Sequence, residues 1–196
     1  METIAVTIEG TAPLLMHNQR LANPLDPYTI ALKKLTAKRQ KTQDDHEQIA
    51  RAEFLGSLYY DKATGVYMPG QNIEACLRDG AKLKRRGAMV QRGLTCPELY
   101  IPLLHKGPKS AEQLWDIEKF RDIRGVIVGG KRIMRCRPYF VDWQLAFTLW
   151  FQPDIIDADV ARQCLHDAGE QTSLGDYRPR YGRFAITQWK VNGNGR

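Results

Sequence analysis

The sequence predicts an α+β fold in which helices cover an antiparallel sheet. Two observations support this prediction. The order strand, helix, strand occurs twice, once in each half of the chain. The chain has 196 residues, of which 43% are hydrophobic and 26% charged, and this is the composition of a folded protein with a buried core. We therefore expect one domain, or one domain with an embellishment.

The first half of the chain opens with a predicted strand and continues with helices. Residues 3–15 alternate between polar and apolar side chains, as a half-buried strand does. Pro27 suits the first position of a helix, and Asp44 followed by Glu47 has the spacing of a capping box at the start of a second helix. Residues 27–57 are thus expected to form a helical insertion.

A hairpin and a third helix are predicted next. Aromatic and branched residues flank the loop 61–65, which favours two short strands joined there. Pro69 and Gly70 end the second of these strands. Apolar residues spaced as on one helical face then predict a helix that begins near Asn72, with Asn72 as its cap. Imperfect alternation over residues 93–104 indicates a further strand.

Residues 105–137 are expected to form a loop followed by a basic hairpin. The loop contains one possible helical turn near Trp115. Gly129 and Gly130 make the two-residue connection that tight hairpins use, and a strand rich in Lys and Arg follows them. This hairpin is predicted to project from the rest of the fold.

The last third of the chain is predicted as strand, helix and strand over residues 143–151, 157–169 and 184–191. The simplest packing of two such units is a modified ferredoxin-like, or RRM-like, antiparallel sheet backed by helices. Two diverged copies or one elaborated copy would both fit. We expect residues 1–191 to form a single domain and residues 192–196 to be a flexible tail.

The charge balance favours a polyanionic partner. The chain has 29 Lys and Arg against 22 Asp and Glu, a formal net charge of +7, which points to nucleic acid first and to an acidic protein or membrane surface second. No apolar run approaches the 18 to 20 residues, roughly, of a membrane span, and the N-terminus lacks a secretory pattern, so we expect a cytoplasmic protein. The cysteines and histidines lack metal-ligand spacing, and neither a metal nor a cofactor is expected.

The basic residues are concentrated in two runs. Residues 78–92 contain six of them against Asp79 alone, and residues 119–137 contain seven against Asp122 alone. We expect these runs to contact phosphates. The candidate contacts there are Arg78, Lys82, Lys84, Arg85, Arg86, Arg92, Lys131 and Arg132. Five tyrosines could stack on unpaired bases, which favours a single strand over a duplex: Tyr59, Tyr60, Tyr67, Tyr177 and Tyr181.

The string YMPGQNIEACLRDGAK, residues 67–82, places a helix directly after Pro-Gly, so that backbone amides of Gly70, Gln71 and Asn72 could bind an anion. This string resembles the signature of the RAMP superfamily of CRISPR-associated proteins. The matching positions are Tyr67, Met68, Pro69, Gly70, Ile73, Ala75, Leu77 and Arg78. Gln71 and Asn72 replace the usual pair of serines, and Glu74 stands where a basic residue is common.

A second string, SLGDYRPRYGRFAI at residues 173–186, is similar to the glycine-rich loop and closing strand of that superfamily. Its arginines Arg178, Arg180 and Arg183 offer bidentate donors to phosphate, and glycines allow close backbone approach. The opening strand also fits the way these folds begin, so the matches follow the family's order. The resemblance implies an RRM-like core most like the backbone subunits that line up along guide RNA.

These observations predict a non-catalytic protein that binds single-stranded nucleic acid, with RNA favoured, and acts in antiviral defence. It would assemble side by side as a homo-oligomer or filament, with other effector subunits as further partners. Two alternatives stay open. One is an interaction or inhibitory module that mimics a subunit of a CRISPR-type complex. The other is a metal-dependent endoribonuclease that uses Asp26, in the loop after the first strand.

Overall fold

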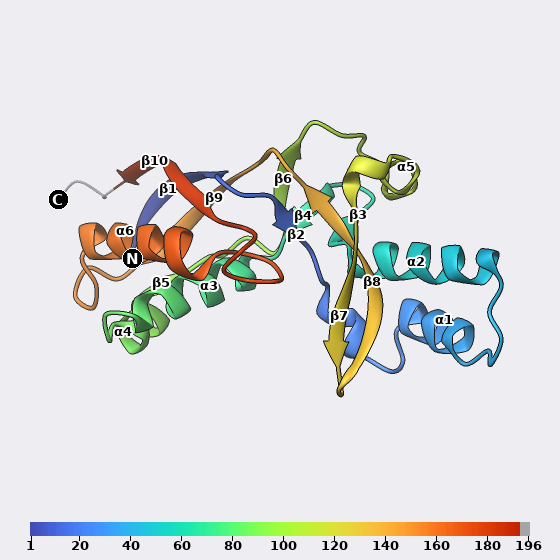
Figure 1. The fold of residues 1–196 in the computed structure, drawn as a ribbon. Helices are drawn as coiled ribbons and strands as arrows, with labels where there is room; N and C mark the ends of the chain where they lie inside the picture. Colours follow the sequence, from blue (N-terminus) through green and yellow to red (C-terminus); the bar gives the residue numbers. More distant parts are fainter. Residues whose placement is uncertain (193–196) are drawn as a thin grey trace. The chain divides into compact units, whose positions relative to one another are not determined.

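The structure is a computed structural model that describes residues 1–192 (Figure 1). The chain divides into two compact units. Unit 1 consists of Met1–Leu14, Tyr67–Lys106 and Val141–Arg196, and unit 2 of Leu15–Val66 and Gly107–Phe140. The single domain expected over residues 1–191 stays a prediction. Of the expected tail, Asn192 ends the last strand, and residues 193–196 lie outside the described part of the chain.

Unit 1 is built on an antiparallel sheet with the strand order β10-β1-β9-β6-β4. A short strand, β5, pairs with the far end of β9. The strands are β1 (Glu2–Gly10), β4 (Gly65–Met68, whose first two residues belong to unit 2), β5 (Leu94–Thr95), β6 (Ile101–His105), β9 (Trp143–Phe151) and β10 (Phe184–Asn192). The predicted alternation in the first strand is confirmed, because Ile4, Val6 and Ile8 are all buried.

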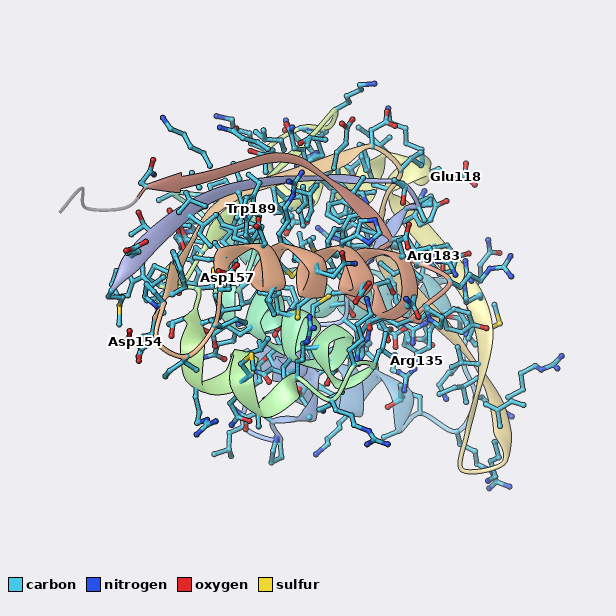
Figure 2. The ribbon with its side chains drawn as sticks, turned by 90° about the vertical axis from the view of Figure 1, so that its left-hand side faces the viewer. Glu118, Arg135, Asp154, Asp157, Arg183 and Trp189 are labelled. Carbon is cyan, nitrogen blue, oxygen red and sulfur yellow. The ribbon has the colours of Figure 1, made fainter. Side chains whose placement is uncertain are left out.

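Three helices lie along one face of this sheet, as both views show (Figures 1 and 2). They are α3 (Gly70–Lys82), α4 (Gly87–Gly93) and α6 (Ala158–Asp167), the last continued by the π-helical turn η3 (Ala168–Thr172). The core between the two layers is apolar, and each large side chain buried there stabilises the fold by about 1.5–3 kcal/mol. The predicted fold class, an antiparallel ferredoxin-like sheet backed by helices, is confirmed.

Unit 2 contains the predicted helical insertion and the predicted hairpin. Its elements are β2 (Leu14–Leu15), which begins at the last residue of unit 1, η1 (Gln19–Ala22), α1 (Pro27–Thr36), α2 (Gln43–Ser57), β3 (Tyr60–Asp61), α5 (Ala111–Asp116), η2 (Glu118–Phe120), β7 (Arg121–Val128) and β8 (Lys131–Phe140). The hairpin is longer than expected, since its register runs from Val128 opposite Lys131 back to Arg121 opposite Pro138. No helix among residues 1–192 is long and apolar enough to cross a membrane.

Two predicted helix caps are wrong. Helix α3 begins at Gly70, after Pro69, and Asn72 lies inside its first turn, where Nδ2 donates to the sulfur of Met68 at 3.3 Å. The capping box of α2 joins Thr42 to Asp45 instead of Asp44 to Glu47. The Thr42 hydroxyl accepts a hydrogen bond from the backbone N–H of Asp45 at 3.2 Å, and the Asp45 carboxylate accepts one from the backbone N–H of Thr42 in return.

The strand expected over residues 93–104 is interrupted. Its two parts, β5 and β6, pair with opposite ends of β9, and the segment between them bulges away from the ladder. The carboxylate of Glu98 fills the gap, because its Oε1 accepts the Thr148 N–H at 2.7 Å. A side chain therefore replaces a missing backbone partner in the middle of the sheet.

The same segment crosses the first turn of α3 at Gly70. A Cβ at that position would overlap the carbonyl oxygen of Glu98 and lie 3.0 Å from that of Cys96. Close packing of two backbones thus explains the glycine of the Pro-Gly motif. Glu74, one turn further along α3, accepts the Cys96 N–H at 2.8 Å and holds the crossing in place.

Replacing Gly70 with Ala should lower the free energy of unfolding by about 1–3 kcal/mol, because the added methyl group has to displace backbone atoms. Urea unfolding followed by tryptophan fluorescence measures this. Gly125→Ala is the matched control, since the nearest atoms there belong to the flexible Arg132 side chain at 3.3 Å. Equal stabilities of the two variants would contradict the packing role of Gly70.

Candidate nucleic-acid interface

Five predicted contact residues gather where α3 ends and α4 begins. Helix α3 ends at Lys82 and α4 starts at Gly87, so the turn between them consists of only four residues. Arg85 adopts a φ of 59°, in the left-handed region that commonly ends helices. The predicted contacts in and beside this turn are Arg78, Lys82, Lys84, Arg85 and Arg86; the middle three are exposed, and Arg78 and Arg86 are half-buried. Arg92 is exposed at the far end of α4.

Asp79 joins this turn to the glycine-rich loop. Its carboxylate accepts a hydrogen bond from Lys82 Nζ at 2.8 Å and lies 3.6 Å from Nη1 of Arg178. The pKa of Asp79 is lowered, chiefly by the hydrogen bond from Lys82 and further by the charges of Lys82, Arg178 and Arg78, although burial opposes the shift. One acidic side chain thus holds cations from two segments that are about 100 residues apart in the sequence.

Asp167 at the end of α6 anchors a second cation of the turn, Lys84. Its carboxylate is 6% exposed and lies 2.7 Å from Nζ of Lys84. Burial by itself would raise the pKa of Asp167, but hydrogen bonds from Lys84 and Gln163 outweigh it, so the pKa is lowered. The Lys84 ammonium is therefore held near a fixed point while about half of the Lys84 side chain stays exposed.

The glycine-rich loop is closed by backbone contacts. Gly182 donates to the carbonyl of Pro13 at 2.7 Å, and its own carbonyl accepts the Leu174 N–H at 2.9 Å. A φ of 73° and the overlap of any Cβ with Leu174 require glycine at this position. The loop is also tied to α3, because the Cys76 thiol donates to the carbonyl of Ser173 at 3.3 Å. These contacts fix the backbone of the loop that carries the three predicted arginines.

The predicted arginines of the loop are all exposed. Arg180 lies over the ring of Tyr181, and Nε of Arg183 donates to the carbonyl of Pro179 at 2.9 Å. Arg183 also borders a hollow of about 840 Å³ between α6 and the start of β10, where Arg162 forms part of the wall. Figure 2 shows Asp154 and Asp157 beside the start of α6 and Arg183 toward its other end.

Lys131 and Arg132 belong to unit 2 and lie at the tip of the hairpin. Gly129 and Gly130 have φ values of 56° and 77°, as the predicted two-residue turn requires, and nothing lies within 4 Å of a Cβ built on either. Both basic side chains are exposed. Unit 2 as a whole has 16 Lys and Arg against 10 Asp and Glu, whereas unit 1 has 13 against 12, so six of the seven net charges belong to unit 2.

The start of α3 offers less to an anion than the sequence predicts. Gly70 is buried, and the carboxylates of Glu74 and Glu98 bind backbone groups near it. Gln71 is exposed and Asn72 is half-buried. Contact of Gly70, Gln71 and Asn72 with nucleic acid stays a prediction. Glu74, which stands where the RAMP signature commonly has a basic residue, accepts a hydrogen bond from the backbone N–H of Cys96.

The tyrosines differ in what they could offer to a base. Tyr59 is buried, Tyr67 is packed against Tyr100 with ring centroids 4.3 Å apart, and Tyr177 is exposed and 5.9 Å from Tyr181. Tyr177 is thus the one exposed side chain of the five, whereas Tyr60, Tyr67 and Tyr181 are half-buried.

Asp26 serves as a helix cap. It precedes α1, and its Oδ1 accepts the Tyr28 N–H at 2.9 Å, while Oδ2 accepts Nε of Arg20 at 3.1 Å. Both carboxylate oxygens therefore have partners within unit 2. Across residues 1–192, no group of three or more His, Cys, Asp or Glu side chains could hold a metal ion.

Sequence reasoning missed the two acidic residues that organise the turn. The pairing of Asp79 with Lys82 has the i, i+3 spacing of helical ion pairs and could have been found. The pairing of Asp167 with Lys84 has no local signal, because it arises only when α6 packs beside α3. Lys33 and Lys34 of α1 are also exposed cations that the predicted set omits.

The comparisons with known proteins support the fold and little more. No protein-family model matches the chain, and no curated protein is similar in sequence. A solved structure matches instead: a chain from the cryo-EM structure of the Type III-B Cmr-beta bound to cognate target RNA, with a TM-score of 0.55 and 10% sequence identity. The match covers 97% of this chain but 60% of that one, so this chain spans about three fifths of its neighbour's length.

The four thiols should resist thiol reagents in the native protein. All four cysteines are free and buried, and burial raises the pKa of Cys76 and of Cys136 to about 12, which keeps them as neutral thiols at pH 8. Ellman's reagent should label none of them within minutes at pH 8 and all four in denaturant. Rapid native labelling of Cys76, identified by mass spectrometry, would contradict the packing of the glycine-rich loop on α3.

Proposed function

We propose that this chain binds single-stranded nucleic acid, RNA in preference to DNA, through the phosphate backbone and without cleaving it. The observation that carries the proposal is the group of cations at the α3–α4 turn, linked through Asp79 to Arg178 of the glycine-rich loop. Cations held in this way suit a flexible polyanion whose phosphates repeat along its length. Binding would therefore tolerate many sequences.

The preference for RNA rests on two further observations. The fold is similar to that of a chain from an RNA-bound Cmr-beta structure. The Pro-Gly motif lies at the junction of β4 and α3, and the glycine-rich loop lies directly before β10, which matches the places that the RAMP resemblance implies. We propose on this basis a RAMP-type, CRISPR-associated protein that assembles side by side as a backbone subunit. Asp26 takes no catalytic part in this proposal, since its Oδ1 caps α1 and its Oδ2 is paired with Arg20.

Salt dependence of binding tests the proposed surface. Each phosphate contact that is removed should lower the slope of log K against log salt by about 0.7 for a single strand. Arg85→Gln and Arg132→Gln suit this test because neither arginine makes an ion pair within residues 1–192. Lys190→Gln removes the same charge near the far end of β10 and should leave the slope unchanged. Fluorescence anisotropy with labelled RNA and DNA strands measures these slopes.

A stronger variant reverses the charge at four of these positions. The quadruple substitution of Lys84, Arg85, Lys131 and Arg132 with Glu should abolish binding of RNA and single-stranded DNA at 0.1 M salt, roughly, provided that circular dichroism shows an intact fold. Unchanged binding would show that the surface is placed wrongly. Wild-type protein that purifies free of nucleic acid and binds none at low salt would favour an interaction module instead.

Replacing Asp79 with Asn should strengthen binding. The carboxylate competes with phosphate for Lys82 and Arg178, and removing it frees both cations at once. We expect a gain of up to about fivefold in affinity, the size of one ion-pair interaction of about 1 kcal/mol in water. Asp159→Asn, near the start of α6, makes the same charge change as a control. Weaker binding by Asp79→Asn would mean that Asp79 is needed to orient the two cations.

A further inference from the structure

A hollow of about 420 Å³ lies within unit 2, where α1, α2 and β8 meet. Aliphatic side chains from four elements form much of its wall: Leu21, Leu32, Ile49, Ile133 and Met134. None of the five is fully buried, and Met134 is 62% exposed, so their apolar surface can be reached from solvent. The volume falls in the range of sites that enclose small organic groups, roughly 300–1,000 Å³.

Two cations lie at the edge of this aliphatic wall. Lys33 is exposed on α1 and makes no ion pair with any described residue. Arg135 on β8 is paired with Glu53, whose carboxylate is 3% exposed and also accepts the Cys136 N–H at 2.8 Å. This buried carboxylate holds the guanidinium in place, while a third of the Arg135 side chain stays exposed. A guanidinium has five N–H donors, more than a single carboxylate can use.

The combination fits a ligand with a flat apolar body next to negative charges. A nucleotide is such a ligand, because its base is planar with two apolar faces and its phosphates are anionic. Unit 2 carries six of the seven net positive charges, which favours a polyanion over a neutral peptide at this surface. Methionine in the wall suits a partner of variable shape, since its side chain is unbranched and polarisable.

We propose that this hollow holds one unstacked base of the bound strand, with neighbouring phosphates at Lys33 and Arg135. This inference rests on the proposed function and adds to it a site whose lining residues are not in the predicted contact set. The base would be held by apolar contact rather than by hydrogen-bond readout, so the site would accept different bases.

Strands that contain the fluorescent base 2-aminopurine test the site. A base enclosed in the hollow should be protected from the soluble quencher acrylamide, so the wild-type complex should show a smaller quenching constant than the free strand. The strand is a single-stranded RNA of uridines with 2-aminopurine at several positions. Binding is measured on the same samples by anisotropy, which separates loss of the base site from loss of the strand.

Two matched pairs of variants locate the effect. Met134→Ser removes wall surface, whereas Ile127→Ser makes a similar change at a 72% exposed residue of the same hairpin that lies outside the hollow. Lys33→Gln removes a cation of the hollow, and Lys34→Gln removes its neighbour on α1. Met134→Ser should lose protection and weaken binding by about fivefold, the low end of what one base contact contributes. Lys33→Gln should lose protection as well, while Ile127→Ser and Lys34→Gln should keep it.

The outcomes separate this proposal from the proposed function. A wild-type complex that binds the strand but quenches like the free strand overturns the base site alone. Equal protection in all four variants also overturns it. A competing oligoglutamate peptide gives a further outcome. If this peptide binds in the hollow and displaces the strand, and the protection of 2-aminopurine is lost only as the strand leaves, the hollow would be assigned to an acidic protein. A wild-type protein that binds no strand at low salt overturns both proposals.

Discussion

The crossing of residues 96–98 over the first turn of α3 fixes how this helix lies against the sheet of unit 1. Two backbones approach so closely there that only glycine fits at position 70. Two carboxylates secure the crossing, Glu74 on the Cys96 N–H and Glu98 on the Thr148 N–H. Because one of them belongs to α3 and the other reaches β9, the helix is fixed against the sheet. The direction of α3, and hence the position of its basic end, follows from this contact.

The basic end of α3 shows how acidic residues can serve a cationic surface. Long side chains lose considerable conformational entropy when they are fixed, and a surface that fixes them in advance reduces the loss on binding. Asp79 and Asp167 hold Lys82, Arg178 and Lys84 in this way. The same carboxylates compete with phosphate for these cations, and for Asp79 we expect this competition to outweigh the gain from order. When a nucleic-acid strand binds, its phosphates would replace these carboxylates as partners of the cations.

The two units differ in how their charges are distributed. Unit 1 is nearly neutral overall and concentrates its cations at one turn and one loop, whereas unit 2 carries most of the net charge on the insertion and the hairpin. Buried Glu53 links these parts of unit 2, because it lies on α2 and binds Arg135 and the Cys136 N–H of β8. An aliphatic hollow with a cationic edge results, and it adds shape to what would otherwise be a purely electrostatic surface.

The sequence alone determined the elements that depend on local patterns of residues. The alternation around Ile4 predicted β1, and the glycine pair before Lys131 predicted the hairpin turn, because each depends on local backbone geometry. The Pro-Gly motif also indicated the junction of strand and helix. Its cap was misread, since Asn72 is inside the helix.

Tertiary packing alone decided the partners of side chains from distant segments. Neither the pairing of Glu74 with Cys96 nor that of Lys84 with Asp167 has a signal in sequence spacing. Runs of basic residues could be located from the sequence, but which cations are held by carboxylates could not. The neighbours of a charged residue along the chain can be read from the sequence, whereas its neighbours in space depend on how the chain folds.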